Sequence, residues 1–371
     1  MPHPAPDEHD DLDDLPPPPP VHYAEQSLLG ALLLAPHRLD EISPLNPESF
    51  SNHAHGELLR AMRATPAPDA EQERASPSWL NTVLDAARPH APGLSASYLH
   101  TLIQVCPWPK HAATYARMIR ADHARRSLRM HAERLAQTAV DTTLPHRAKT
   151  TVQQADTLAR FLDDLSGRFA AHPGSLPRTA LPPAPARDTS EEALDEERLL
   201  IATATAYPAE TSQMRWLVSE DFAFPLHAAL WQCLTALTHR GDAVDPITVL
   251  WEAQHRGLLA HDIAPADLLA LLSTPVGSPE HWGEKVLQRA LLTRAQTVAV
   301  SIAAFTDDPA NSPHQLITGS RRALADLTAL RSRWQQATSP AVPRTARPAR
   351  TPAAPRAGPP PRIAPTPVRA R

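Results

Sequence analysis

The sequence lacks the short motifs that nucleotide-binding and catalytic sites usually require. It contains no Gly-Lys dipeptide, and therefore no GxxxxGK[ST] loop, whose backbone amides cradle phosphate and whose lysine reaches the β- and γ-oxygens. GxGxxG, HExxH and GxSxG motifs are also missing. We therefore predict no catalytic residues and no cofactor, and we expect that the protein neither binds nor hydrolyses ATP.

Cysteine is rare as well. Cys106 and Cys233 are the two cysteines, and neither stands in a CxxC motif or at ligand spacing from a histidine. We predict two reduced thiols, with no disulfide and no zinc site. His53, His55 and His227 have no third ligand at a useful spacing, so we interpret them as helix-start or core histidines.

No apolar run approaches the roughly 20 residues that a membrane span requires, and the N-terminus is acidic and proline-rich, unlike a signal peptide. This pattern predicts a cytoplasmic protein with no membrane segment. The formal net charge of -4 provides no global field that would attract nucleic acid. Four adjacent like-charged pairs are interpreted as solvated helix surfaces, not as acid/base dyads or phosphate contacts: Glu196-Glu197, Asp163-Asp164, Arg125-Arg126 and Arg321-Arg322.

The 42 prolines cluster in a few stretches that divide the chain. Such stretches are too poor in large apolar residues to offset their ordering entropy. We predict a disordered acidic arm at 1–20, a flexible Pro/Ala/Arg linker at 171–190, and a disordered tail at 337–371 with seven arginines and no acidic residue. Between them, residues 21–170 and 191–336 are rich in Ala and Leu and poor in Gly, which favours helices.

The two ordered regions repeat one pattern. Ala24-Glu25-Gln26-Ser27-Leu28-Leu29-Gly30 has a worn copy about 171 residues later, Asp195-Glu196-Glu197-Arg198-Leu199-Leu200-Ile201. Phe50, His55 and Leu58 then match Phe222, His227 and Leu230 at one offset, and Tyr115 matches Trp282 further on. Matches that keep their order at a nearly constant offset indicate a tandem duplication.

These motifs resemble the N-terminal domain of DnaB-type replicative helicases. The resemblance rests on A-E-Q-S-L-L-G-A-L-L-L, on a Phe-containing turn followed by His, and on Y-A-R-M-I-R at 115–120. Asp245-Pro246-Ile247-Thr248-Val249 resembles the family's D-x-I-T-V helix start, from which the first copy departs with Ser76-Pro77-Ser78-Trp79-Leu80. In these helicases the domain precedes a RecA-like motor, but here a second copy of the domain follows the first.

The apolar spacing of each copy predicts an all-α fold of two small helical bundles, each with a globular head and a helical hairpin. The hairpins carry more apolar residues than a lone two-helix arm needs, so we expect them to pair with each other within one chain, with pairing between chains as the alternative. The candidate interaction residues are Tyr115, Met118, Ile119, Phe161, Phe169, Trp282, Val286, Leu327 and Trp334.

The resemblance implies a role in DNA replication, since helicase domains of this kind pair through their hairpins, form a collar and dock the primase. Three functions remain open at this stage. The protein could be a non-catalytic adaptor or regulator that contacts a helicase or a primase. It could be an accessory protein that binds DNA weakly and without sequence preference through its Arg-rich tail, or the non-catalytic half of a split helicase.

Overall fold

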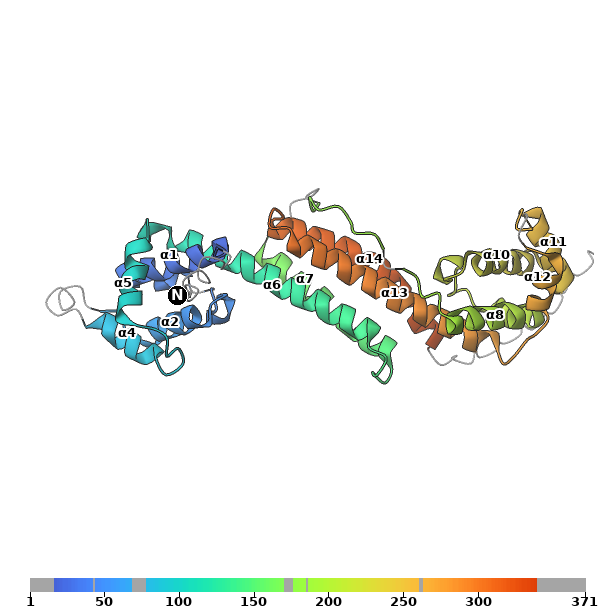
Figure 1. The fold of residues 1–371 in the computed structure, drawn as a ribbon, viewed down its shortest axis with the longest axis horizontal. Coiled ribbons are helices and arrows are strands. Elements are labelled where there is room, and N and C mark those ends of the chain that lie inside the picture. The colour runs from blue at the N-terminus through green and yellow to red at the C-terminus, as the bar shows by residue number, and fades with distance from the viewer. Residues whose placement is uncertain are drawn as a thin grey trace, which may run out of the picture. The chain divides into compact units, whose positions relative to one another are not determined.

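The described part of the chain is built from helices alone. The computed structural model describes residues 17–42, 44–68, 78–169, 176–184, 186–259 and 263–338, and these ranges contain no strand (Figure 1). The prediction of an all-α fold with two heads and two hairpins is confirmed. Most of the arm at 1–20 and of the tail at 337–371 lies outside the described residues.

Each copy contributes a head of short helices and a hairpin of two long ones. The first head comprises α1 (Pro20–Leu34), α2 (His53–Ala64), α4 (Trp79–Ala87) and α5 (Ala96–Val105), with 3-10 turns η2 (Pro36–Ile42), η3 (Pro47–Ser49) and η4 (Pro109–His111). Its hairpin is α6 (Ala112–Val140) and α7 (Arg147–Arg168). The second head comprises α8 (Glu191–Ala206), α9 (Pro208–Thr211), η5 (Ser219–Asp221), α10 (Pro225–Arg240), α11 (Pro246–His255) and α12 (Pro265–Leu272). Its hairpin is α13 (Pro279–Asp307) and α14 (Pro313–Thr338).

Side-chain caps start several of these helices. Asn52 accepts a hydrogen bond from the Ala54 N–H at 2.9 Å, and Asp245 accepts from the Ile247 and Thr248 N–H groups at 2.8 and 2.9 Å. These caps satisfy backbone donors that have no partner inside the helix, and each contributes about 1 kcal/mol to helix stability. In the α6–α7 turn His146 adopts a left-handed conformation with φ of 57°.

Burial shows how closely the two copies match. Helices α6 and α13 each have 29 residues, and all eight buried positions of α6 are buried at the corresponding positions of α13. The eight buried positions of α1 likewise fall on buried positions of α8, but only when Glu25 is aligned with Glu197. The sequence pattern pairs Leu28-Leu29 with Leu199-Leu200 and thereby aligns Glu25 with Glu196. This alignment is wrong by one residue, because burial matches Glu25 to Glu197.

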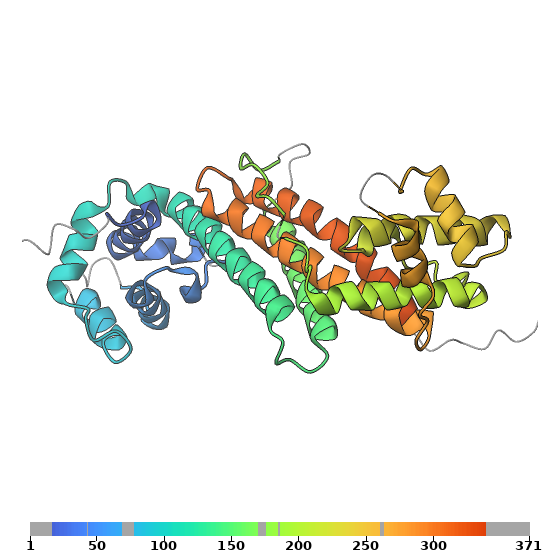
Figure 2. The same ribbon diagram turned by 45° about the vertical axis from the view of Figure 1, so that its right-hand side comes forward.

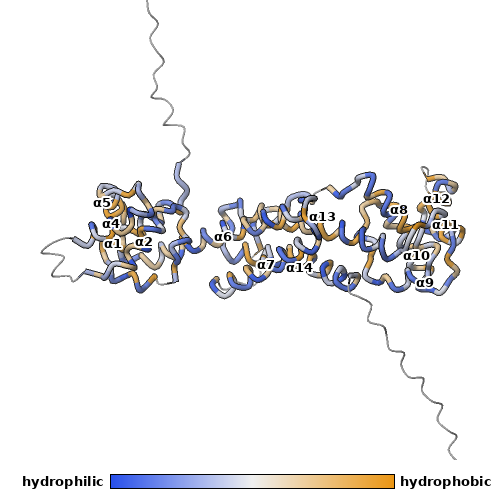
Figure 3. Tube along the Cα trace, turned by 90° about the horizontal axis from the view of Figure 1, so that it is seen from below, coloured by the Kyte–Doolittle hydropathy of each residue, from blue (hydrophilic) through white to orange (hydrophobic). Residues whose placement is uncertain are grey.

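The apolar side chains form two main cores of unequal reach. One core belongs to the first head and includes only the beginning of α6, through Ala112, Ala116 and Ile119. The other core is shared, because it joins the second head to both hairpins in one continuous cluster. In Figure 3 hydrophobic residues recur along both hairpins and through the heads. Through Ala337 the described helices belong to one compact unit, so the two copies are not independent bundles.

The predicted linker has no helix in its described part, but it is not a free coil. The Arg178 N–H donates to Asn311 Oδ1 at 2.8 Å, Thr179 Oγ1 donates to Asp308 Oδ2 at 2.6 Å, and Gln315 Nε2 donates to the Leu176 carbonyl at 3.0 Å. The expectation of a flexible linker is therefore corrected for residues 176–179, which these hydrogen bonds hold. Composition did not predict these contacts. They are hydrogen bonds to polar side chains in and next to the α13–α14 turn, and they need no large apolar side chains in the linker.

We predict that Gly319→Ala releases this segment from α14. A Cβ atom at Gly319 would overlap the Pro177 ring, so either the segment or the helix must move. Trypsin should then cleave after Arg178 and Arg187 several-fold faster than in the wild type, as followed by mass spectrometry. Gly167→Ala is the matched control, because a Cβ there meets no atom within 4 Å and cleavage should not change. Equal cleavage of both variants would contradict the packing of the segment.

Candidate functional site: the paired hairpins

The two hairpins lie side by side (Figure 2). They bury a common apolar interface. Leu128, Leu135, Leu158 and Leu162 of the first copy belong to the same cluster as the apolar residues of the second hairpin. The second hairpin contributes Leu291, Val298, Ile302, Leu316, Leu324 and Leu327, among others. The expected pairing of the hairpins within one chain is thus present in the structure.

The candidate interaction residues divide into three groups. Phe161 and Phe169 pack with Ile317 of α14, and Leu327 is buried where α14 faces α7, so these residues lie at the hairpin interface. Trp282, Val286 and Trp334 also belong to the shared core or pack against it.

Tyr115 and Ile119 lie instead in or against the core of the first head, and Met118 is 51% exposed. The first turns of α6 therefore serve the head, and only the rest of that helix enters the interface.

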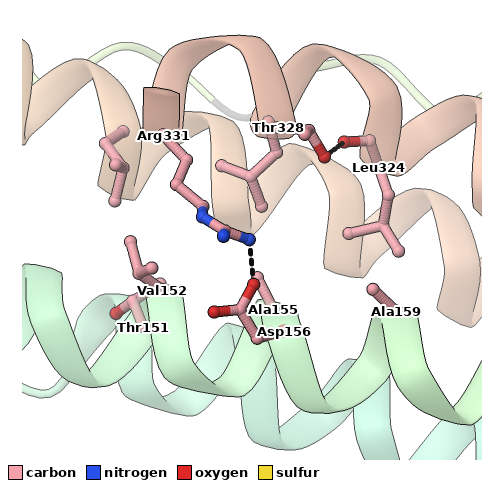
Figure 4. A pocket seen from close by; sticks show the side chains of 10 residues that line it. Thr151, Val152, Ala155, Asp156, Ala159, Leu324, Thr328 and Arg331 are labelled. Carbon is pink, nitrogen blue, oxygen red and sulfur yellow. Dashed lines mark hydrogen bonds and ion pairs between the residues drawn. The ribbon is translucent and has the colours of Figure 1, made fainter. Parts of the chain in front are cut away.

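A small cavity of about 20 Å³ marks the place where α7 faces α14 (Figure 4). Val152, Ala155 and Ala159 of α7 line one side of it, and Leu324 and Thr328 of α14 line the other. It is large enough for about one water molecule. Asp156 and Arg331 form an ion pair beside the cavity.

Two further ion pairs, Asp163–Arg321 and Arg129–Asp307, also join the copies. All three ion pairs are partly exposed, and each contributes about 0–1 kcal/mol to the stability of the paired hairpins. They therefore fix how the hairpins align along each other more than how strongly they associate.

Arg125 makes the most extensive polar contact between the copies. Its guanidinium donates to the carbonyls of Thr306 and Asp308 at 3.1 and 2.6 Å, and to those of Pro309 and Asn311. These carbonyls lie at the end of α13 and in the turn that follows, where helix carbonyls lack partners and the helix dipole favours a cation. Arg125 is thus a cap for the second hairpin supplied by the first.

A buried carboxylate–histidine pair holds each head together. In the first head His55 Nδ1 is 2.7 Å from Glu25 Oε2, and His55 Nε2 is 2.6 Å from the Tyr98 hydroxyl. The Ser51 N–H donates to the other oxygen of Glu25. Glu25 and His55 are both fully buried, so the pair ties α1 to the start of α2 inside the core.

The second head repeats the pair with the same spacing of 30 residues. His227 Nδ1 is 2.9 Å from Glu197 Oε2, and the Ala223 N–H donates to Glu197 Oε1 at 2.6 Å. A carboxylate that receives a backbone N–H and an imidazole is well satisfied, and such a pair can stay buried without catalysing anything. The expectation of core histidines at 55 and 227 is confirmed, while His53 lies exposed at the start of α2.

The electrostatics of Glu25 follow from this geometry. Burial alone would raise the pKa of the carboxyl, but the hydrogen bonds from His55 and Ser51 outweigh it, and the pKa lies below its ordinary value. Glu25 is therefore an anion at neutral pH. A carboxylate in this state is suited to structural pairing and not to proton donation.

The interpretation of Glu196-Glu197 as a solvated pair is wrong. Glu197 is buried against His227, and Glu196 is buried against Arg289 and Lys285 of α13. The sequence did not reveal this burial, because the partners of both carboxylates lie 26 or more residues away along the chain.

The other adjacent charged pairs are closer to expectation. Asp163 and Asp164 lie on the surface in ion pairs, with Arg321 and Arg168. Arg126 pairs with Asp122 and donates to the Ser49 carbonyl, whereas Arg125 serves the interface.

Neither cysteine is placed for chemistry. Cys233 is buried, and burial raises the pKa of its thiol to about 11, while burial also raises the pKa of the half-buried Cys106. In the described ranges, no three His, Cys, Asp or Glu side chains are grouped as a metal ion would require. No helix in the same ranges has the length and apolar character needed to cross a bilayer.

Comparison with known families agrees with this architecture. The model of the DnaB-like helicase N terminal domain matches the chain twice, over residues 17–121 and 189–286. The chain belongs to this family. No curated protein and no solved structure matches it. The two matches support the tandem arrangement and make the protein a helicase-related module.

The DnaB-like domain matches end within the first turns of α6 and α13. They cover both heads, with their buried Glu–His pairs, and stop before the interface. Most of the hairpin core therefore lies beyond the residues that define the DnaB-like domain here. The hairpin core is formed by the packing of α6, α7, α13 and α14.

Proposed function

We propose that the protein is a non-catalytic interaction module of the DNA replication apparatus, in which two DnaB-like domains act as one tethered pair that docks onto a replicative helicase or a primase. The observation that carries this proposal is the shared core of the two hairpins. Family resemblance implies that such hairpins pair between subunits of a helicase collar. Here both partners come from one chain, so the pair forms at an effective concentration of about millimolar.

The heads support a docking role more than a catalytic one. Their buried polar groups, Glu25–His55 and Glu197–His227, are engaged in structural pairing and are closed to solvent. The absence of a Gly-Lys dipeptide from the sequence also argues for a partner, and not this chain, as the source of any ATP-driven step.

We expect the purified full-length protein to bind the replicative helicase or the primase of its own organism with micromolar or tighter affinity. Biolayer interferometry with each immobilised partner would measure the affinity, and multi-angle light scattering would give the stoichiometry. Binding to the helicase would indicate a contact with its collar, and binding to the primase would indicate mimicry of that collar.

A variant with an open hairpin pair, Leu327→Asp, distinguishes docking by the tethered pair from docking by one head. The proposal expects this variant to bind at least tenfold more weakly. If neither helicase nor primase binds the wild-type chain at 10 μM, as an order-of-magnitude limit for a specific contact, the proposal is contradicted.

A further inference from the structure

An aromatic and basic corner lies on the first head, where α5 ends and α6 begins. We define the basic corner as Trp108, Lys110, His111, Tyr115 and Arg117. The Lys110 ammonium lies 5.2 Å from the centre of the Trp108 ring. The His111 ring lies 6.4 Å from that of Trp108 and 6.2 Å from that of Tyr115. Trp108 is 58% exposed, so its ring is accessible to a ligand.

The chain segment that forms this corner carries charge of one sign. No acidic residue occurs from 86 to 121, the segment that holds α5, η4 and the first turns of α6. Lys110 and Arg117 are exposed and form no ion pair with any residue in the described ranges. The 3-10 turn η2 packs on α6 and carries Asp40 and Glu41, but Glu41 pairs with Arg38.

The same corner of the second head is different. There Glu280 and Glu284 stand at the start of α13, and Lys285 is paired with Glu196. The indole N–H of Trp282 donates to the Val276 carbonyl at 2.6 Å. The duplication thus provides an internal reference, in which one corner has exposed cations beside an exposed indole and the other has acids and a hydrogen-bonded indole.

We propose that the basic corner binds single-stranded nucleic acid, with Trp108 stacking on a base and Lys110 and Arg117 contacting phosphates. An exposed aromatic ring beside free cations is the arrangement that sequence-independent single-strand binding uses. An acidic peptide would use the cations but would leave Trp108 without a role. This site is separate from the hairpin interface and from the Arg-rich tail.

The test measures fluorescence anisotropy of a labelled dT20 oligonucleotide with the full-length protein at low and physiological salt. Trp108→Ala should weaken binding on the order of tenfold through loss of stacking. The double variant Lys110→Glu/Arg117→Glu should weaken binding further and reduce the slope of log affinity against log salt by about 1.4, because each phosphate contact to a single strand contributes about 0.7. The tail contributes an equal background to every variant.

The second head supplies matched controls. Trp251 is 60% exposed, so Trp251→Ala removes an equally accessible indole, and Arg215→Glu reverses an exposed charge. Both should bind dT20 within about twofold of the wild type, the scatter expected of a change outside the contact. Equal affinities of the Trp108→Ala and Trp251→Ala variants would overturn the proposal. Binding of dT20 at Trp108 that arises only after removal of residues 1–16 would also overturn the proposal. In that case the ligand of the basic corner would be the acidic segment of the chain itself and not a nucleic acid.

Discussion

Leu327→Asp is expected to separate the two hairpins while most of the helix content remains. Leu327 is 3% exposed and faces Val152 and Ala155 of α7 across the small cavity. Truncation of a buried leucine alone costs about 2–5 kcal/mol, and a buried carboxylate without a partner adds to that cost. A loss of about 4 kcal/mol shifts the pairing equilibrium by roughly three orders of magnitude. Small-angle scattering should show a larger radius of gyration with far-UV circular dichroism close to that of the wild type.

Met118→Asp is the control for this experiment. Met118 also lies on a long hairpin helix but is 51% exposed, so the same carboxylate there remains in water. Scattering from this variant should match the wild type at every concentration. An unchanged radius of gyration for Leu327→Asp, with the protein folded, would show that the interface does not depend on α7 facing α14.

Glu25→Ala is expected to lower the free energy of unfolding of the first head by about 3–5 kcal/mol. The substitution leaves His55 and the Ser51 N–H buried without their acceptor. Urea unfolding monitored by circular dichroism would measure the change. Glu133→Ala should change stability by less than about 1 kcal/mol, because Glu133 is 57% exposed in its pair with Arg129. A loss for Glu25→Ala no larger than this control would show that the pair is dispensable.

The pair also has a predictable pH dependence. Since the pKa of Glu25 is lower in the folded state than its ordinary value of 4.5, its stabilisation is complete above that value and disappears as pH falls through the folded-state pKa. Glu25→Gln should remove this contribution and flatten the acid limb of the stability curve. Other carboxylates with lowered pKa, such as Glu252 at about 2, remain in both proteins, so the difference between the two curves isolates Glu25.

The sequence predicted the heads and hairpins because their signals are local. Helical spacing and helix starts such as Asp245-Pro246 act within a few residues. Pairing of the hairpins was predictable from their surplus of apolar positions. The split of α6 into a head part and an interface part was not, since Tyr115 and Phe161 both appear as apolar residues of one hairpin.

The polar contacts depended on residues far apart in the chain, so they were predicted less well. The Glu–His pairs left one usable signal, namely the spacing of 30 residues that Glu25–His55 shares with Glu197–His227. Arg125 gave no signal, because its acceptors are backbone carbonyls about 180 residues away. Backbone acceptors are independent of residue type, which is why no motif marks this contact.

The cap that Arg125 places on the second hairpin has a consequence for how the protein can evolve. At the position of α13 that corresponds to Arg125, the second copy has Leu292, which cannot donate a hydrogen bond. In a symmetric homodimer one mutation changes the same residue in both subunits. A contact made by one subunit is then always made by the other as well, so the two sides of the interface cannot differ. Fusion of the two copies into one gene removes this constraint. Each half can then acquire substitutions that suit only its own position, as the arginine on one side and the leucine on the other illustrate.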